Sequence, residues 1–145
     1  MGRAGARFHG SCVARDGAGV LLLGPSDAGK SDLALRLLGR GFVLVADDQV
    51  DVIDGFAQAP GALAGMLEVR GIGIVRLPYL SDIKLYVVIE LTEQSERLPH
   101  PERHAELDLP LVRLCASEVS AADRVALALD CALGRITQHA GAFTA

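Results

Sequence analysis

The sequence has no tryptophan, and its aromatic residues make up only 4% of the chain. Long hydrophobic runs are missing as well. The longest run near the start, Val20 to Leu23, is far shorter than the roughly 20 residues that cross a bilayer and the roughly 7 to 15 of a signal peptide. We therefore expect no membrane association and no secretion, and we place the protein in the cytoplasm.

Cysteine is scarce too. The three cysteines, Cys12, Cys115 and Cys131, are odd in number and include no C-x-x-C pair of the kind that binds zinc or does redox chemistry. The chain is long enough to bury a core without disulfides, and reduced thiols suit a cytoplasmic protein. We expect buried, reduced thiols.

Positive charge does not dominate the chain. Its 14 Lys and Arg face 18 Asp and Glu, a formal net charge of -4, so a nucleic-acid partner is not expected. Lysine itself is rare, with Lys30 and Lys84 as the only two, which makes a lysine inside a chemical motif informative. With 145 residues, 50% hydrophobic and 22% charged, the chain is predicted to fold as one domain over residues 1–145.

Periodicity and turn residues predict a mixed α/β fold. Arg15-Asp16-Gly17 is expected to join two strands into a hairpin. Helices are expected over residues 30–38 and after a Ser120-x-x-Asp123 capping box, the second one ending at Gly134. Strands are expected over residues 8–14, 18–23, 42–46, 83–91 and 109–114, with a small antiparallel meander over residues 50–67 and an exposed loop over residues 92–104.

The strongest motif lies between the second predicted strand and the first predicted helix. Residues 24–31 match G-x-x-x-x-G-K-[ST], the phosphate loop of nucleotide-binding proteins. Its backbone N–H groups and the helix N-terminus would hold phosphates, Lys30 would reach the terminal phosphates, and the Ser31 hydroxyl would bind Mg²⁺. The predicted ATP-binding residues are Gly24, Pro25, Ser26, Asp27, Ala28, Gly29, Lys30 and Ser31. A chance glycine-rich turn is the alternative.

Two adjacent carboxylates follow the apolar strand at residues 42–46. In an open α/β sheet the carboxyl end of a strand is where ligands bind, so Asp47 and Asp48 are expected to face the phosphate loop. One could hold a hydrated Mg²⁺ while the other serves as a base. A loop with two solvated aspartates is the alternative. No N-K-x-D guanine-reading sequence is present, which disfavours a GTPase.

A third feature is the segment Met66 to Ile74, where Glu68 and Arg70 stand in an apolar stretch beside closely spaced glycines. A buried charge needs a partner or a ligand, so these two side chains either bind something or pair with each other. His9 stands alone on a short strand and is either a structural or a catalytic histidine.

These segments together resemble the catalytic C-terminal domain of HPr kinase/phosphorylase. The resemblance rests on the phosphate loop, on Gly41-Phe42-Val43-Leu44-Val45-Ala46-Asp47-Asp48 and on Met66-Leu67-Glu68-Val69-Arg70-Gly71-Ile72-Gly73, with weaker likeness at His9-Gly10 and Glu96-Arg97-Leu98. It covers residues 7–98, about two thirds of the chain.

The resemblance implies a bifunctional enzyme that phosphorylates a serine of HPr, the small phosphocarrier of the sugar phosphotransferase system, and removes that phosphate by phosphorolysis. It implies a nucleotide-binding core similar to that of phosphoenolpyruvate carboxykinases, and a homo-oligomer, since the long members form hexamers. In this chain Lys30 would contact the transferred phosphate and Ser31 and Glu68 would serve Mg²⁺. Asp48, with Asp47 beside it, would accept the serine proton, and His9 and Arg97 would be further catalytic residues.

The chain departs from the family pattern in two ways. It is expected to be a short form with the catalytic domain alone, and its tail has no Pro-Val-Arg-Pro-Gly-Arg-Asn segment, so hexamer geometry and phosphorolysis are open. Two other functions also stay open, a kinase of a small metabolite and an ATP-sensing module without turnover. Whether pyrophosphate replaces ATP, which effectors act and which pathway is controlled are not encoded in any motif.

Overall fold

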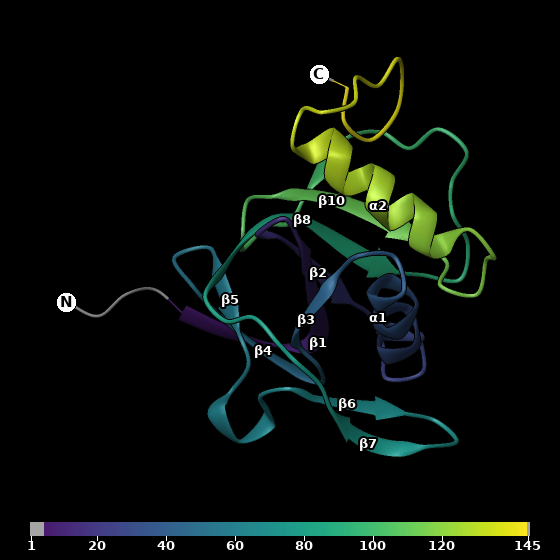
Figure 1. The fold of residues 1–145 in the computed structure, drawn as a ribbon. Coiled ribbons are helices and arrows are strands. Elements are labelled where there is room, and N and C mark those ends of the chain that lie inside the picture. The colour runs from purple at the N-terminus through teal and green to yellow at the C-terminus, as the bar shows by residue number, and fades with distance from the viewer. Residues whose placement is uncertain (1–4, 145) are drawn as a thin grey trace.

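The computed structural model describes residues 5–144 (Figure 1). Its strands and helices, in chain order, are β1 Gly5–Arg15, β2 Ala18–Leu23, α1 Lys30–Leu38, β3 Val43–Ala46, β4 Gln49–Ile53, β5 Phe56–Gln58, a 3₁₀ turn Gly61–Leu63, β6 Met66–Val69, β7 Gly73–Arg76, β8 Ile83–Leu91, β9 Glu102–Arg103, β10 Pro110–Leu114 and α2 Ala121–Ala132. The predicted mixed α/β class with a helix near the C-terminus is confirmed.

The first hairpin forms as predicted. β1 pairs antiparallel with β2, and Arg15 lies opposite Ala18 across the turn. The two turn residues have positive φ, 52° at Asp16 and 77° at Gly17. This left-handed pair gives the turn a twist that matches the twist of the strands. The phosphate loop begins directly after β2, the second strand of this hairpin.

The main sheet is mixed, and five of its strands close on themselves. The pairings run β2-β1-β4-β5-β8, and β8 pairs again with β2 in parallel. One apolar cluster, which includes Leu21, Val50 and Val88, fills the inside of this ring. A second cluster lies between the sheet and the two helices and includes Leu22, Leu37 and Leu129, so α1 and α2 cover one face (Figure 1).

The phosphate loop lies at an edge where three parallel strands end. β2, β8 and β10 run in the same direction, because β8 pairs in parallel with both of its neighbours. The carboxyl ends of the three strands therefore meet at one edge, the usual ligand edge of such sheets. The segments that follow β8 and β10 lie beside the loop that follows β2.

β3 forms where an apolar strand was predicted. Leu44, Val45 and Ala46 are almost fully buried. β3 pairs antiparallel with β1, as does β4, so the two aspartates do not follow one of the three parallel strands. Asp47 and Asp48 interrupt what would otherwise be one long strand along β1. An interruption of this kind redirects side chains, and such irregularities are frequent beside active sites.

The region after β5 departs from the prediction. β4 and β5 form the expected antiparallel pair, but Gly61–Leu63 is a 3₁₀ turn and β6 pairs only with β7, in a separate two-stranded sheet. Glu68 and Arg70 are exposed rather than buried, so neither needs the other as a partner. The meander is therefore a two-stranded hairpin followed by a projecting second hairpin, β6–β7 (Figure 1).

The structure also bears on the predicted helix cap at Ser120, on the cysteines and on membrane-spanning helices. Ser120 does precede α2, but its side chain makes no capping bond to the backbone and instead accepts a hydrogen bond from Arg124 Nε at 2.8 Å. Of the three cysteines, all free, only Cys12 is fully buried. No helix within residues 5–144 is long and apolar enough to cross a membrane.

Candidate functional site

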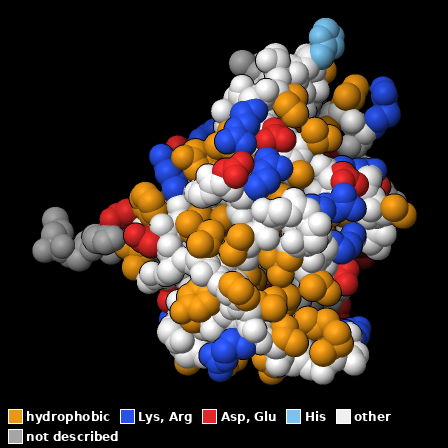
Figure 2. All heavy atoms as spheres, viewed as in Figure 1, with side chains coloured by type: hydrophobic (Ala, Val, Ile, Leu, Met, Phe, Trp, Pro, Cys, Tyr) orange, Lys and Arg blue, Asp and Glu red, His pale blue; other side chains and the backbone are white. Residues whose placement is uncertain are grey.

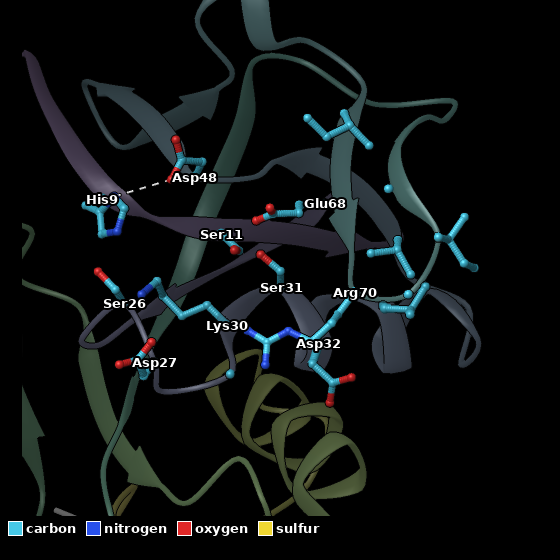
Figure 3. Close-up of a pocket in the computed structure, with 17 residues that line it drawn as sticks. His9, Ser11, Ser26, Asp27, Lys30, Ser31, Asp32, Asp48, Glu68 and Arg70 are labelled. Atoms are coloured by element: carbon cyan, nitrogen blue, oxygen red, sulfur yellow. Dashed lines mark ion pairs between the residues drawn. The ribbon is translucent and has the colours of Figure 1, made fainter.

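One cavity of about 780 Å³ lies between the phosphate loop, the first turn of α1 and the β6–β7 hairpin (Figure 3). From the loop and α1 come Ser26, Lys30 and Ser31. Asp48 and Glu68 approach from the strand interruption and from β6. The cavity therefore joins the three sequence motifs, which are far apart in the chain, in one place.

The phosphate loop is held open by local geometry. Gly29 is the N-cap of α1 and has a φ of 93°. Glycine adopts this left-handed backbone conformation without the strain that a side chain would cause. A Cβ on Gly29 would lie 3.3 Å from the Cβ of Ala116, which follows β10. The N-terminus of α1, with its free N–H groups and positive dipole end, consequently opens toward the cavity and suits a phosphate.

Lys30 is turned back onto its own loop. It is only 6% exposed, and its Nζ donates hydrogen bonds to the carbonyl oxygens of Gly24 at 2.7 Å and Pro25 at 2.8 Å. Burial lowers the pKa of this ammonium group, while the nearby charges of Asp47, Asp48 and Asp27 act in the opposite direction. The ammonium lines the cavity and can exchange these carbonyls for phosphate oxygens.

The two aspartates have different environments. Asp47 is 5% exposed and lies behind the cavity wall. Its Oδ1 accepts hydrogen bonds from Ser31 Oγ at 2.8 Å and from Ser11 Oγ at 2.6 Å. The backbone N–H of Glu68 is 3.4 Å from its Oδ2. The buried carboxylate is thus satisfied by donors, and it orients the phosphate-loop serine.

Asp48 instead projects into the cavity. Its side chain is 62% exposed, and its φ of 71° turns it away from the side on which Asp47 lies. His9 Nδ1 lies 3.6 Å from Asp48 Oδ1, marked by the dashed line in Figure 3. Gly10, next to His9, permits the close approach of β1 to β2, because a Cβ there would lie 2.5 Å from the carbonyl oxygen of Leu22. An exposed carboxylate beside an imidazole can accept or pass on a proton.

The remaining charges on the cavity wall are unbalanced. Four carboxylates, those of Asp27, Asp32, Asp48 and Glu68, line the cavity together with two cations, Lys30 and Arg70. Asp32 is paired with Arg36 at 3.1 Å, which leaves three carboxylates for the two cations. A polyphosphate entering this cavity would be repelled unless further positive charge came with it. The site therefore suits a nucleotide that carries a divalent cation.

The residues present fit Mg²⁺ in particular. Mg²⁺ prefers oxygen ligands and keeps several waters, so it is usually held by one or two carboxylates together with substrate phosphates. Ser31, Asp48 and Glu68 supply such oxygens to the cavity. Within residues 5–144 no group of three or more His, Cys, Asp or Glu forms a metal cage, so a nucleotide's phosphates would have to complete the shell.

Most of the predicted site residues come together. His9, Ser26, Asp27, Gly29, Lys30, Ser31, Asp48 and Glu68 line the cavity, and Asp47 lies directly behind it. Gly24, Pro25 and Ala28 shape the loop without lining the cavity. Arg97 is exposed and is not among the lining residues, so the structure does not bring it to the site.

Ser11 was not among the predicted site residues, although it lines the cavity and bonds to Asp47. Its only signal in the sequence is a hydroxyl at the point where the apolar part of β1 begins. Leu35, on α1, and the hairpin residues Ile72 and Ile74 also line the cavity and were not predicted.

The sequence matches the family described as HPr Serine kinase C-terminal domain over residues 4–106. The chain belongs to this family. The match includes the phosphate loop, both aspartates and the β6–β7 hairpin. It ends before β10 and α2.

Curated relatives agree with this assignment. The chain is 46% identical over 101 residues to an HPr kinase/phosphorylase from Clostridium tetani, which covers 63% of this chain and 33% of that protein. It is 38% identical over 125 residues to one from Clostridium acetobutylicum, covering 74% of this chain and 41% of that protein. The chain thus spans well under half the length of these relatives.

The fold has a match among solved structures. An Hpr(Ser) kinase/phosphatase from Coxiella burnetii superimposes with a TM-score of 0.68 at 23% identity, covering 86% of this chain and 87% of that chain. Because that identity is low, the likeness concerns the fold. It extends further along the chain than the family match does.

Proposed function

We propose that this chain is an ATP- and Mg²⁺-dependent kinase that phosphorylates a serine of an HPr-like phosphocarrier protein. The observation that carries the proposal is that Lys30 of the phosphate loop and the exposed carboxylate of Asp48 line the same cavity. Serine phosphorylation needs a cation at the transferred phosphoryl group and a proton acceptor at the hydroxyl. Membership of the HPr Serine kinase family supports HPr as the protein that supplies the serine.

Each residue then has a role that follows from its position. The N–H groups of the loop and the N-terminus of α1 bind the phosphates. Lys30 leaves the carbonyls of Gly24 and Pro25 and contacts the transferred phosphoryl group. Ser31 and Glu68 are the residues that would hold Mg²⁺, which supplies positive charge at the phosphates and so offsets the surplus of carboxylates.

The transfer step exchanges one bond at the γ-phosphorus of ATP for another. The serine oxygen of the substrate bonds to the γ-phosphorus, and the bond from that phosphorus to the bridging oxygen of ATP breaks, leaving its electron pair on ADP. The proton of the serine hydroxyl goes to Asp48, whose exposed carboxylate has one ion pair among residues 5–144, with His9 at 3.6 Å. Asp47, already engaged with Ser11 and Ser31, is not available for this task.

The shape of the site favours a protein over a small metabolite. A metabolite kinase needs an enclosure with fixed polar groups. Here the wall opposite the phosphate loop is the projecting β6–β7 hairpin, whose Ile72 and Ile74 are 77% and 70% exposed. Apolar side chains gather over this part of the molecule in the lower half of Figure 2. An exposed apolar wall suits contact with another protein.

We also propose that the enzyme is cytoplasmic and that it is a homo-oligomer. Light scattering of the purified chain would measure the mass of the assembly. The proposed core is similar to that of phosphoenolpyruvate carboxykinases, since both would hold a nucleotide at a phosphate loop.

The deciding experiment combines the purified chain with γ-labelled ATP, Mg²⁺ and purified HPr. We expect label on HPr, and none on HPr whose target serine is replaced by alanine. Asp48→Asn provides the matched inactive enzyme. If ATP binds and no label reaches HPr, the ATP-sensing alternative holds. If label reaches a small molecule from a metabolite mixture instead, the metabolite-kinase alternative holds.

A further inference from the structure

Ser11 is the most deeply buried polar side chain among the residues that the structure describes. It lies on β1, directly after His9-Gly10, and is 1% exposed. It nevertheless lines the cavity beside the phosphate loop (Figure 3). A hydroxyl in such a place is costly unless it is hydrogen-bonded.

Its partner is the Asp47 carboxylate. Ser11 Oγ lies 2.6 Å from Asp47 Oδ1, and Ser31 Oγ lies 2.8 Å from the same oxygen. An ionised carboxylate only accepts hydrogen bonds, so both hydroxyls donate their single proton to it. Hydroxyl bonds to a charged acceptor are short and strong, in keeping with 2.6 Å.

The direction of these bonds has a consequence for Ser31. Since its proton points at Asp47, its oxygen lone pairs are left for other partners, and Ser31 lines the cavity. A hydroxyl oriented in this way can bind a cation. Its orientation lasts only while Asp47 stays in place, and Ser11 makes the shortest hydrogen bond that holds Asp47.

We propose that Ser11 is a positioning residue: it holds the Asp47 carboxylate so that Ser31 keeps its oxygen free for the divalent cation that accompanies a nucleotide. The inference rests on the proposed function only in requiring a nucleotide with Mg²⁺ in this cavity. It does not require transfer to HPr. Ser11 acts through Asp47 and Ser31 and touches no reacting atom.

The test measures binding without turnover. The dissociation constant of ADP is determined by calorimetry with Mg²⁺ and with excess chelator. The constant in chelator divided by the constant in Mg²⁺ is the ratio that reports how much Mg²⁺ strengthens binding. Groups that orient metal ligands typically change metal affinity by about 10- to 100-fold. We expect Ser11→Ala to lower the ratio by about 10-fold, with little change in ADP affinity in the chelator.

Ser11→Thr keeps the hydroxyl and is expected to restore the ratio, and Ser11→Cys, with a weaker donor, to fall between. Ser81→Ala, which removes an exposed serine bonded to Gln58 on another part of the surface, is the control and should leave the ratio unchanged. Should Ser11→Ala fail to fold, Ser11→Cys carries the test, with a reduced ratio still expected.

The route through Asp47 is tested by a double-mutant cycle. If Ser11 acts through that carboxylate, adding Ser11→Ala to Asp47→Asn has no further effect on the ratio. An unchanged ratio in Ser11→Ala, an equal loss of affinity with and without Mg²⁺, or additive effects in the cycle would overturn the proposal. If the wild-type protein binds ADP more tightly with Mg²⁺ but does not phosphorylate HPr, the kinase function is wrong and the role of Ser11 is unaffected.

Discussion

The ammonium group of Lys30 lies 2.7 Å from the carbonyl oxygen of Gly24, six residues earlier in the chain. The phosphate loop therefore closes on its own lysine. Under the proposed function a nucleotide would have to replace these internal hydrogen bonds with phosphate contacts, so the same side chain would serve the stability of the free protein and the chemistry of the bound one.

Lys30→Ala is expected to lower the rate of phosphoryl transfer by about 10² to 10³, the usual effect of removing one preorganised group that stabilises charge in the transition state. It should also lower the free energy of unfolding by about 1 kcal/mol, because two loop carbonyls lose their donor. Transfer assays and thermal melts of the same preparations measure both. Transfer at the wild-type rate would exclude the assigned role.

Asp48→Asn is expected to reduce turnover by about 10² to 10⁴, the usual contribution of a positioned base, with little change in ATP affinity. Stability should hardly change, because the side chain is 62% exposed. Glu68→Gln should instead raise the Mg²⁺ concentration needed for half-maximal activity. A purely affinity-based defect in Asp48→Asn would mean that the base is another residue.

The double substitution Ile72→Ser and Ile74→Ser is expected to raise KM for HPr several-fold while leaving kcat and ADP binding unchanged. The two side chains are exposed on the hairpin, so their loss should cost no folding stability. Leu127→Ser, an exposed apolar residue on α2 outside the cavity, is the matched control. Equal effects of the two changes on KM would argue against the hairpin as a docking wall.

The thiol of Cys115 is expected to react first with iodoacetamide. The hydrogen bond with Ser117, 3.1 Å between Sγ and Oγ, lowers the pKa of Cys115. Burial raises the pKa of Cys12 and of Cys131. A lower pKa gives more thiolate at neutral pH, hence faster alkylation.

Mass spectrometry of the alkylated protein between pH 6 and 9 would locate the adduct. Ser117→Ala should slow the reaction near neutral pH and move its rise to higher pH. Faster modification of Cys131 than of Cys115 would contradict the assignment.

Phosphorolysis is expected to be weak compared with the kinase reaction. It brings phosphate and phosphoserine together, and cations must offset their repulsion. Arg113 is paired with Glu90 and Glu102, Arg124 donates to Glu118 and Ser120, and neither arginine lines the cavity. Incubating phospho-HPr with millimolar phosphate should therefore release little pyrophosphate, and release at the forward rate would show that another group, such as one on a neighbouring subunit, supplies the charge.

Local residue patterns were enough to predict the Asp16-Gly17 hairpin, the phosphate loop and the bounds of α1. Each depends on residues within one turn or one helix, where backbone preferences and short-range spacing suffice. The sequence also indicated, through likeness of short segments, which distant residues share a site. Where those segments are adjacent in space, as with Lys30, Asp48 and Glu68, that indication agrees with the cavity.

The different environments of the two aspartates depend on long-range contacts. Ser11 and Asp47 are 36 residues apart, and Ser31 and Asp47 are 16 apart, so no local pattern encodes their hydrogen bonds. Two adjacent aspartates are equivalent in sequence. Pairing of β3 and β4 with β1, together with the positive φ at Asp48, buries one among hydroxyl donors and turns the other toward the cavity. The burial of Asp47 among hydroxyl donors and the exposure of Asp48 in the cavity both follow from that long-range strand pairing.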